Sequence, residues 1–283
     1  MISSANASSA TAESKNLGSQ LSRQFGSPTY QPPVLPKIAL EVHALTHRSD
    51  ITFREVVDTL AMDPLLAGGV LSRAQSAIFT ARIPPRTLLE AVRRLGLRTT
   101  RDIVWEIALR MRVFVAPGYV EPVAALTRHS AITAHLCRTV CARAGLEMPH
   151  AFLCGLLHNV GLLASLVLVT EMFDFSNLPA VTDIATGLEP LHEEAGGQLA
   201  RIWGLGEEIQ RGVEQHHHPR SLEGYLVCLA STIAAEECGT EELPRIEEHD
   251  TDLIDAARVA LGLSDADLEA LRMDAVHIGT VVR

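Results

Sequence analysis

Apolar residues recur every three or four positions along most of this chain, which is the period of an amphipathic helix. Between residues 35 and 47, for example, Ile38, Val42 and Leu45 fall on one helical face. The pattern contains no convincing pair of alternating strands joined by a turn. We therefore predict an all-α fold, in which short loops make successive helices neighbours in space.

Helix-start signals divide the first half of this pattern. Residues 52–55 and 87–90 each place a threonine three positions before a glutamate, which is the sequence of a capping box. The dipeptide at 63–64 is an aspartate followed by proline, a helix N-cap with proline at the first helical position. Gly96 is expected to end the helix that begins near residue 87, and the Pro-Gly dipeptide at 117–118 separates the two halves.

The most apolar stretch lies in the second half, from Ala151 to Val169, after a long predicted helix that runs from Val120 to about Gly145. We expect this stretch to form one buried helix that contains His158 and Asn159. Polar groups are costly to bury without partners, so these two side chains must meet other polar groups there. The same residues interrupt the apolar run, and for that reason we expect no membrane span.

Composition suggests three regions along the chain. Residues 1–33 are rich in Ser, Ala, Asn and Gln and lack an apolar period, so we expect a disordered tail that is dispensable for folding. Residues 34–240 are expected to form the main domain, with an N-terminal helical half at 34–117 and a second half at 118–240. Residues 241–283 are expected to be an acidic helical extension.

Charge is distributed unevenly along the chain, whose formal net charge is -10. Residues 236–274 contain 13 Asp or Glu against 3 Arg, whereas residues 73–143 contain 12 Arg against 4 Asp or Glu. One region is therefore strongly acidic and the other strongly basic. Such regions are either ordinary solvated surfaces or docking faces for charged partners.

Cysteine usage indicates a reducing compartment. The chain has 5 cysteines without a Cys-x-x-Cys pair or a regular framework. The N-terminus has no basic segment followed by an apolar one, so we see no secretory signal. We therefore expect reduced thiols and a cytoplasmic protein.

The chain contains 12 histidines, and these are the main candidates for a functional site. Five fall on four predicted helices: His129, His158, His192, His216 and His217. Imidazoles from several helices can converge on a metal in the core of a bundle, but buried histidines also simply form hydrogen bonds, and the residues alone leave both possibilities open. Five other histidines are expected at the surface or at helix caps: His43, His47, His150, His249 and His277.

An ordered set of short motifs resembles the HDOD family, the HD-related output domains of bacterial signalling proteins, over roughly residues 34–235. The motifs are Leu35-Pro36, Asp63-Pro64-Leu65, Gln75-Ser76 (where the family usually has Asn-Ser), Leu95-Gly96, His129-Ser130, Gly155 to His158 with Gly161, His192 to Gly196, Trp203-Gly204-Leu205 and His216 to Pro219. The resemblance implies an all-helical fold in which an N-terminal helical subdomain packs on an HD-like bundle.

The resemblance extends to the HD and HD-GYP metal-dependent phosphohydrolases, to which the HDOD family is related. It implies that the five candidate histidines stand where those enzymes have imidazole ligands. Two acidic ligands of the enzymes are replaced: Asn159 stands at the Asp of the His-Asp doublet, and Ser231 at the late Asp. A neutral amide and a hydroxyl do not balance the charge of a divalent ion that holds hydroxide. We therefore expect a degenerate site.

The function we expect is a non-catalytic signal-transduction module that acts by protein–protein interaction. We expect no cofactor, apart from a residual divalent metal on the histidines, and no membrane. Direct nucleic-acid binding is not expected, because the protein is acidic and has no helix-turn-helix pattern. Two alternatives remain: a metal-dependent phosphohydrolase of cyclic dinucleotides or related nucleotides, and a nucleotide sensor without turnover in which arginines of 73–143 meet phosphates.

If one of the charged regions is the docking face for a partner protein, the association rate should fall steeply as salt is added. Salt screens exposed charges beyond about 8–10 Å, which removes long-range steering. Charge reversal at Arg93, Arg94 and Arg98 should slow association in the same way. Stopped-flow mixing at several ionic strengths measures both effects, and a rate that does not depend on salt would contradict the hypothesis.

Overall fold

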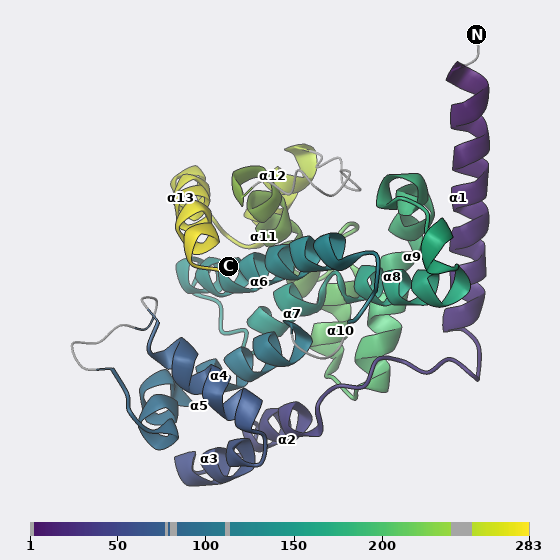
Figure 1. Cartoon of the computed structure of the whole chain (residues 1–283). Coiled ribbons are helices and arrows are strands. Elements are labelled where there is room, and N and C mark those ends of the chain that lie inside the picture. The colour runs from purple at the N-terminus through teal and green to yellow at the C-terminus, as the bar shows by residue number, and fades with distance from the viewer. Residues whose placement is uncertain (1–2, 77–78, 80–83, 111–113, 239–250, 283) are drawn as a thin grey trace. The chain divides into compact units, whose positions relative to one another are not determined.

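The computed structural model describes residues 3–76, 79, 84–110, 114–238 and 251–282, with only the backbone described for 3–13 and 251. Across these residues the regular elements are helices and no strand is found, so the all-α prediction is confirmed. The chain divides into two compact units, residues 33–113 and residues 1–32 with 114–283 (Figure 1). His249 and the first part of the expected acidic extension lie outside the described residues.

The unit at 33–113 consists of α2 (Lys37–Leu45), α3 (Phe53–Ala61), α4 (Pro64–Ala74) and α5 (Leu88–Ala108). Apolar side chains from all four helices form one core, which includes Val42, Leu60, Val70 and Val92. These residues occur at the helical spacing that the sequence shows. The amphipathic period therefore gives this unit its packing as well as its helices.

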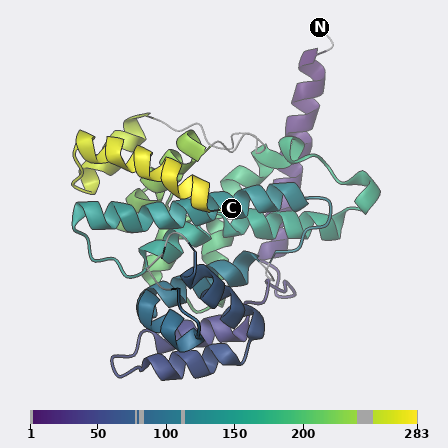
Figure 2. The ribbon, with the colours of Figure 1, turned by 60° about the vertical axis from the view of Figure 1, so that its left-hand side comes forward.

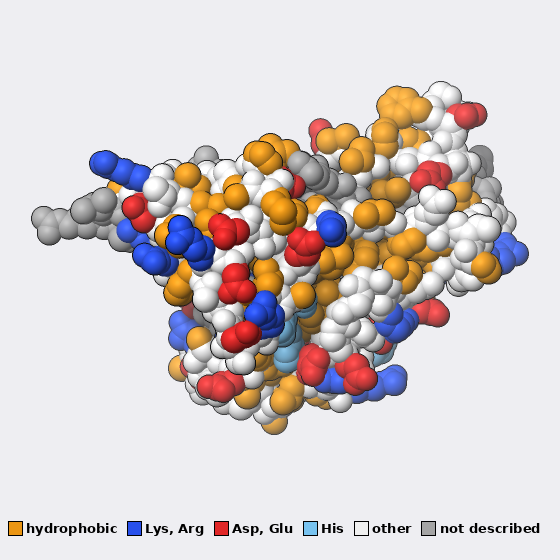
Figure 3. Space-filling view, turned by 90° about the horizontal axis from the view of Figure 1, so that it is seen from below, with side chains coloured by type: hydrophobic (Ala, Val, Ile, Leu, Met, Phe, Trp, Pro, Cys, Tyr) orange, Lys and Arg blue, Asp and Glu red, His pale blue; other side chains and the backbone are white. Residues whose placement is uncertain are grey.

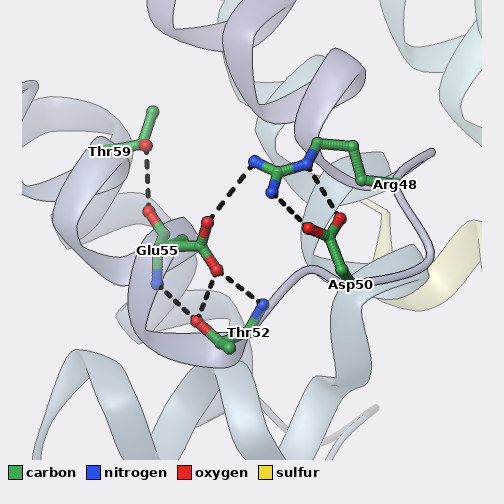
Figure 4. Close-up of polar contacts among 5 residues, drawn as sticks. All are labelled: Arg48, Asp50, Thr52, Glu55 and Thr59. Carbon is green, nitrogen blue, oxygen red and sulfur yellow. Dashed lines mark hydrogen bonds and ion pairs between the residues drawn. The ribbon is translucent and has the colours of Figure 1, made fainter.

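Local capping sets the helix starts in this unit (Figure 4). The Thr52 hydroxyl accepts a hydrogen bond from the Glu55 N–H at 3.2 Å, and the Thr52 N–H donates to the Glu55 carboxylate at 2.9 Å. Arg48 forms ion pairs with Asp50 and with Glu55, at 2.8 Å and 3.4 Å. The predicted boxes at 52–55 and 87–90 and the predicted N-cap at Asp63 are all confirmed.

The predicted helix end at Gly96 takes the form of a kink. Gly96 has φ 74° and ψ 166°, so the helical geometry breaks there, but α5 resumes without a loop. A positive φ is accessible to glycine because it has no Cβ. The expected two helices are therefore two segments of one bent element.

The second unit contains the remaining helices. They are α1 (Ser3–Phe25), α6 (Val120–Ala144), α7 (Ala151–Leu157), α8 (Val160–Met172), the 3₁₀ turn η3 (Phe175–Asn177), α9 (Val181–Ile202), α10 (Glu207–Glu214), α11 (Leu222–Cys238), α12 (Thr251–Ala260) and α13 (Asp265–Val281). Helix α6 packs against α7, α11 and α13, while α9 packs against α1, α8 and α10. The short helices α7 and α10 also contact each other.

The apolar stretch after residue 150 forms two helices, which corrects the expectation of one. Helix α7 ends at Leu157 and α8 begins at Val160, so His158 and Asn159 lie in the junction. By length and composition the range Ala151–Met172 could cross a membrane, with a mean hydropathy of 2.1. However, 94% of its most apolar window is buried inside this fold, as expected for the core helices of a bundle.

The N-terminal segment is helical, and the expectation of a disordered tail over residues 1–33 is wrong for α1. Leu17, Leu21 and Phe25 are 6%, 0% and 3% exposed, and α1 lies beside α9 in both ribbon views (Figures 1 and 2). These three residues are spaced by four, so they share one helical face despite the polar composition around them. A single apolar stripe was enough to dock the helix, because α9 offers a complementary surface.

Helix α13 at the C-terminal end of the chain binds two arginines of the basic region. Arg143 on α6 pairs with Asp274 on α13 at 2.7 Å. Arg128, also on α6, donates to the backbone carbonyls of Gly279 and Val282 at 2.8 and 3.2 Å, and these carbonyls lie at the negative end of the α13 dipole. The two charged regions are therefore partly neutralised within the molecule. Basic and acidic side chains are also interspersed on the face shown in Figure 3.

Replacing Leu21 by alanine should lower the free energy of unfolding by about 2–5 kcal/mol, because it leaves a cavity between α1 and its neighbours. Gln24→Ala is the matched control on the exposed side of the same helix. Urea denaturation followed by circular dichroism measures both variants. An unchanged midpoint for Leu21→Ala would mean that α1 is not packed on the bundle.

Candidate metal centre

The five histidines predicted from the sequence come together in the second unit. His129 lies on α6, His158 follows α7, His192 lies on α9, and His216 and His217 follow α10. Ring centroids are 5.3 Å apart for His129 and His158, 5.1 Å for His158 and His216, and 5.1 Å for His192 and His216. The rings of His216 and His217 are 4.2 Å apart. We call these five residues the histidine cluster.

Two glycines allow the helices to close around the cluster. A Cβ on Gly155 would lie 2.7 Å from the Ala134 Cα on α6, and a Cβ on Gly161 would overlap the carbonyl oxygen of His192 on α9. Only glycine permits so close an approach of two backbones. Because these glycines flank His158 in sequence, they bring its ring within reach of both α6 and α9.

Three of the imidazoles are anchored in the same way. In each, Nδ1 lies at hydrogen-bond distance from the backbone carbonyl oxygen three residues before it in the chain, at 2.8 Å for His158, 2.5 Å for His192 and 2.8 Å for His216. A carbonyl oxygen only accepts hydrogen bonds, so Nδ1 carries the hydrogen. In the neutral ring the lone pair is then on Nε2.

These Nε2 atoms face one another. The Nε2 atom of His192 lies 3.1 Å from that of His216 and 2.9 Å from that of His217. Donor nitrogens of His192, His216 and His217 all lie within 4.8 Å of one another. The Nε2 atom of His158 is buried and has no hydrogen-bond partner among the described residues. Leaving such an atom unsatisfied is costly.

Burial keeps these rings neutral. It lowers the pKa of His192 to about 4. Burial, with smaller contributions from neighbouring histidines, lowers the pKa of His158 and that of His216 well below the ordinary value of 6.5. At neutral pH no proton therefore lies between the Nε2 atoms of His192 and His216, and their lone pairs repel each other.

A metal ion would relieve that repulsion, and the cluster fits one. Two imidazole nitrogens that each lie about 2.05 Å from one ion are about 2.9 Å apart at the right angle of an octahedral site and about 3.3 Å apart at a tetrahedral angle. The observed Nε2 separations of 2.9 and 3.1 Å lie in this range. Ligating histidines usually donate their other ring N–H to a carbonyl or carboxylate, as His192 and His216 do here. His192, His216 and His217 would hold the ion, and His158 lies beside His216.

Glu193 lies next to the cluster and was missed in the sequence. One carboxylate oxygen of Glu193 accepts the backbone N–H of His217 at 2.9 Å and lies 3.5 Å from the Nδ1 atom of His216. Its burial raises the pKa of the carboxyl group, and this effect outweighs the hydrogen bond from His217. In the sequence, the only indication that Glu193 belongs to the site is its position directly after His192. Neighbouring residues of a helix point in different directions, so this position does not show that the Glu193 side chain turns inward.

Asn159 and Ser231 stand where the related hydrolases have acidic ligands, and neither side chain is charged. Asn159 is buried, and its side-chain oxygen has no hydrogen-bond partner in the part of the chain that the structure describes. The Ser231 hydroxyl donates to the Cys228 carbonyl on its own helix at 3.1 Å. Neither side chain supplies a negative charge to a metal.

Histidines outside the cluster follow the sequence expectation only in part. His277 is exposed, as predicted. His43 is instead half-buried, with its ring 5.7 Å from Trp105 in an edge-on contact. Burial, followed by the effects of His47 and Arg101, lowers the pKa of His43 to about 4. The expectation for His43 was wrong because its helical face packs inward.

The fold and the cluster define an all-helical protein of the HD-related type. The HDOD domain family model matches residues 33–219, so this chain belongs to the HDOD family. The matched range contains all five cluster histidines, while Ser231 and the C-terminal helices lie beyond it. An uncharacterized protein from Treponema pallidum (strain Nichols) is 26% identical over 212 residues, which are 71% of this chain and 40% of that protein. This chain therefore spans less than half of that relative.

Solved structures share the fold. A presumed metal-dependent phosphohydrolase from Shewanella amazonensis SB2B has a TM-score of 0.72 at 19% identity, covering 96% of this chain and 100% of its own. An HDOD domain protein of unknown function from Geobacter sulfurreducens has a TM-score of 0.66 at 24% identity, with 93% and 96% covered. A presumed signal transduction protein from Marinobacter aquaeolei VT8 has a TM-score of 0.66 at 20% identity, with 96% and 64% covered.

The metal-free protein should lose stability as the pH falls from 7 to 4. In this window the unfolded chain takes up protons at histidines with pKa about 6.5, whereas folded His192 stays neutral until about pH 4. Each such histidine contributes a slope of at most about 1.4 kcal/mol per pH unit. Urea midpoints measured across this range should fall less steeply in His192→Gln than in the wild type. His277→Gln, an exposed control, should keep the wild-type profile, and equal slopes in all three proteins would contradict the assignment.

Proposed function

We propose that this protein is a non-hydrolytic signalling module that holds a transition-metal ion on its histidine cluster and acts by binding another protein. The main support for metal binding is the way in which His158, His192 and His216 are anchored. Each ring commits Nδ1 to a backbone carbonyl, and the Nε2 atoms of His192 and His216 meet at 3.1 Å. Imidazole donors favour zinc, nickel, copper and iron over magnesium or calcium.

The charges at the site are the reason why we propose no catalysis. A bound divalent metal acidifies its water, and the amount depends on the ion's ligands and their surroundings. Asn159 and Ser231 leave the ion without the two carboxylates that balance charge in the related hydrolases. The ion in this protein would then join α9 to the segment after α10 and hold the fold in one conformation.

Metal binding by the cluster can be tested on the purified full chain. Elemental analysis asks whether an ion co-purifies, and titration of Co²⁺ into chelator-treated protein gives visible bands when imidazoles bind it. We expect binding by the wild type and by His277→Ala, and at least a ten- to hundredfold loss of affinity in His192→Ala and in His216→Ala. Equal Co²⁺ binding by all four proteins would exclude the cluster as the site.

The second candidate is a metal-dependent phosphohydrolase, and Glu193 is the observation that favours it. Its carboxylate lies 3.5 Å from His216 and so brings a negative charge to the edge of the cluster. We nevertheless expect no turnover of cyclic dinucleotides by the wild type. Asn159→Asp combined with Ser231→Asp should raise the affinity for manganese. Wild-type hydrolysis that is abolished by a chelator and by His158→Ala would establish the enzyme instead.

A further inference from the structure

A second polar site lies between α1 and α9, away from the metal-binding nitrogens of the histidine cluster. The two helices lie side by side (Figures 1 and 2) and touch backbone to backbone at Gly18 and Gly187, where a Cβ on either glycine would overlap the other helix. Beside this contact they line an open groove of about 690 Å³. Pockets for small ligands have volumes of about 300–1,000 Å³, so the groove is large enough for one.

One wall of the groove is cationic. Lys15 and Arg23 line it from α1, with Ser22 between them. They are eight residues apart, which places them about 12 Å apart along the helix axis. Neither side chain forms an ion pair with any residue that the structure describes. Both residues are exposed, so a ligand from solution can reach both cations.

The opposite wall offers hydrogen-bond acceptors. Glu194 lines it from α9 and forms no ion pair within the described part of the chain. Pro190 lies inside α9 and has no N–H, so the carbonyl of Thr186 lacks its ordinary partner four residues later. Both Pro190 and Thr186 line the groove. This wall therefore suits a ligand that carries N–H or O–H groups.

We propose that the groove binds an anionic small molecule of the nucleoside monophosphate class. The phosphate would meet Lys15 and Arg23, and the base amine or sugar hydroxyls would meet Glu194 and the Thr186 carbonyl. Arg and Lys are the residues that bind phosphate most strongly, through charge-assisted hydrogen bonds. The ligand would contact the same turn of α9 that carries His192 and Glu193 on its other side, so it would hold that turn in place.

The test is isothermal titration of the metal-free full chain, so that its outcome does not depend on metal binding by the cluster. The probes are AMP, GMP, adenosine and inorganic phosphate. We expect AMP or GMP to bind, and adenosine and phosphate each to bind at least about tenfold more weakly, because each lacks one half of the recognised chemistry. Absence of binding by both nucleotides at about 1 mM would overturn the proposal.

Variants locate the site. Lys15→Gln combined with Arg23→Gln should weaken nucleotide binding by at least about tenfold, and Glu194→Gln should weaken it by a smaller factor. Arg54→Gln is the matched control, since Arg54 is an exposed arginine outside the groove. All of the substituted side chains carry polar or exposed groups, so melting temperatures should match the wild type and confirm folding. Nucleotide binding that survives the double substitution would place the ligand elsewhere.

Discussion

The geometry of the histidine cluster depends on the hydrogen bond from Nδ1 of each anchored imidazole to a backbone carbonyl of its own helix or turn. His158, His192 and His216 each use Nδ1 in this way, which fixes the ring orientation and leaves Nε2 as an acceptor. Nitrogens with lone pairs then meet in the centre of the bundle with no hydrogen between His192 and His216. That arrangement is unfavourable in the empty protein and favourable around a cation. This geometry is the basis of the proposed metal site.

Glycine and the helix junction make this arrangement possible. The helical geometry breaks at Asn159, directly after His158, and the apolar side chains of α7 and α8 stay in the core on both sides of this break. Gly161 removes the one side-chain atom that would hold α8 away from the carbonyl of His192. The geometry of the proposed metal site thus rests on backbone packing, and a methyl group at this position would disturb it without changing any of the histidines.

The remaining helices stabilise this bundle from outside. On one side, α13 is held by Arg128 and Arg143 of α6, the helix that also carries His129. On another, α1 packs on α9, the helix that carries His192. A small part of the charge segregation of the sequence is therefore used to join α6 to α13. Surface ion pairs of this kind contribute about 0–1 kcal/mol each, so their main role is to set where α13 docks.

The sequence by itself determined the helical class, the capped helix starts and the identity of the five cluster histidines. These features depend on neighbours within about four residues, or on motifs that the chain shares with a family, and both are visible in one dimension. Tertiary structure alone decided that Glu193 turns toward the cluster, that His43 packs inward against Trp105, and that α1 is ordered. Each of these outcomes depends on a surface contributed by a distant part of the chain. Burial and pKa are properties of that surface, and a local pattern contains no information about it.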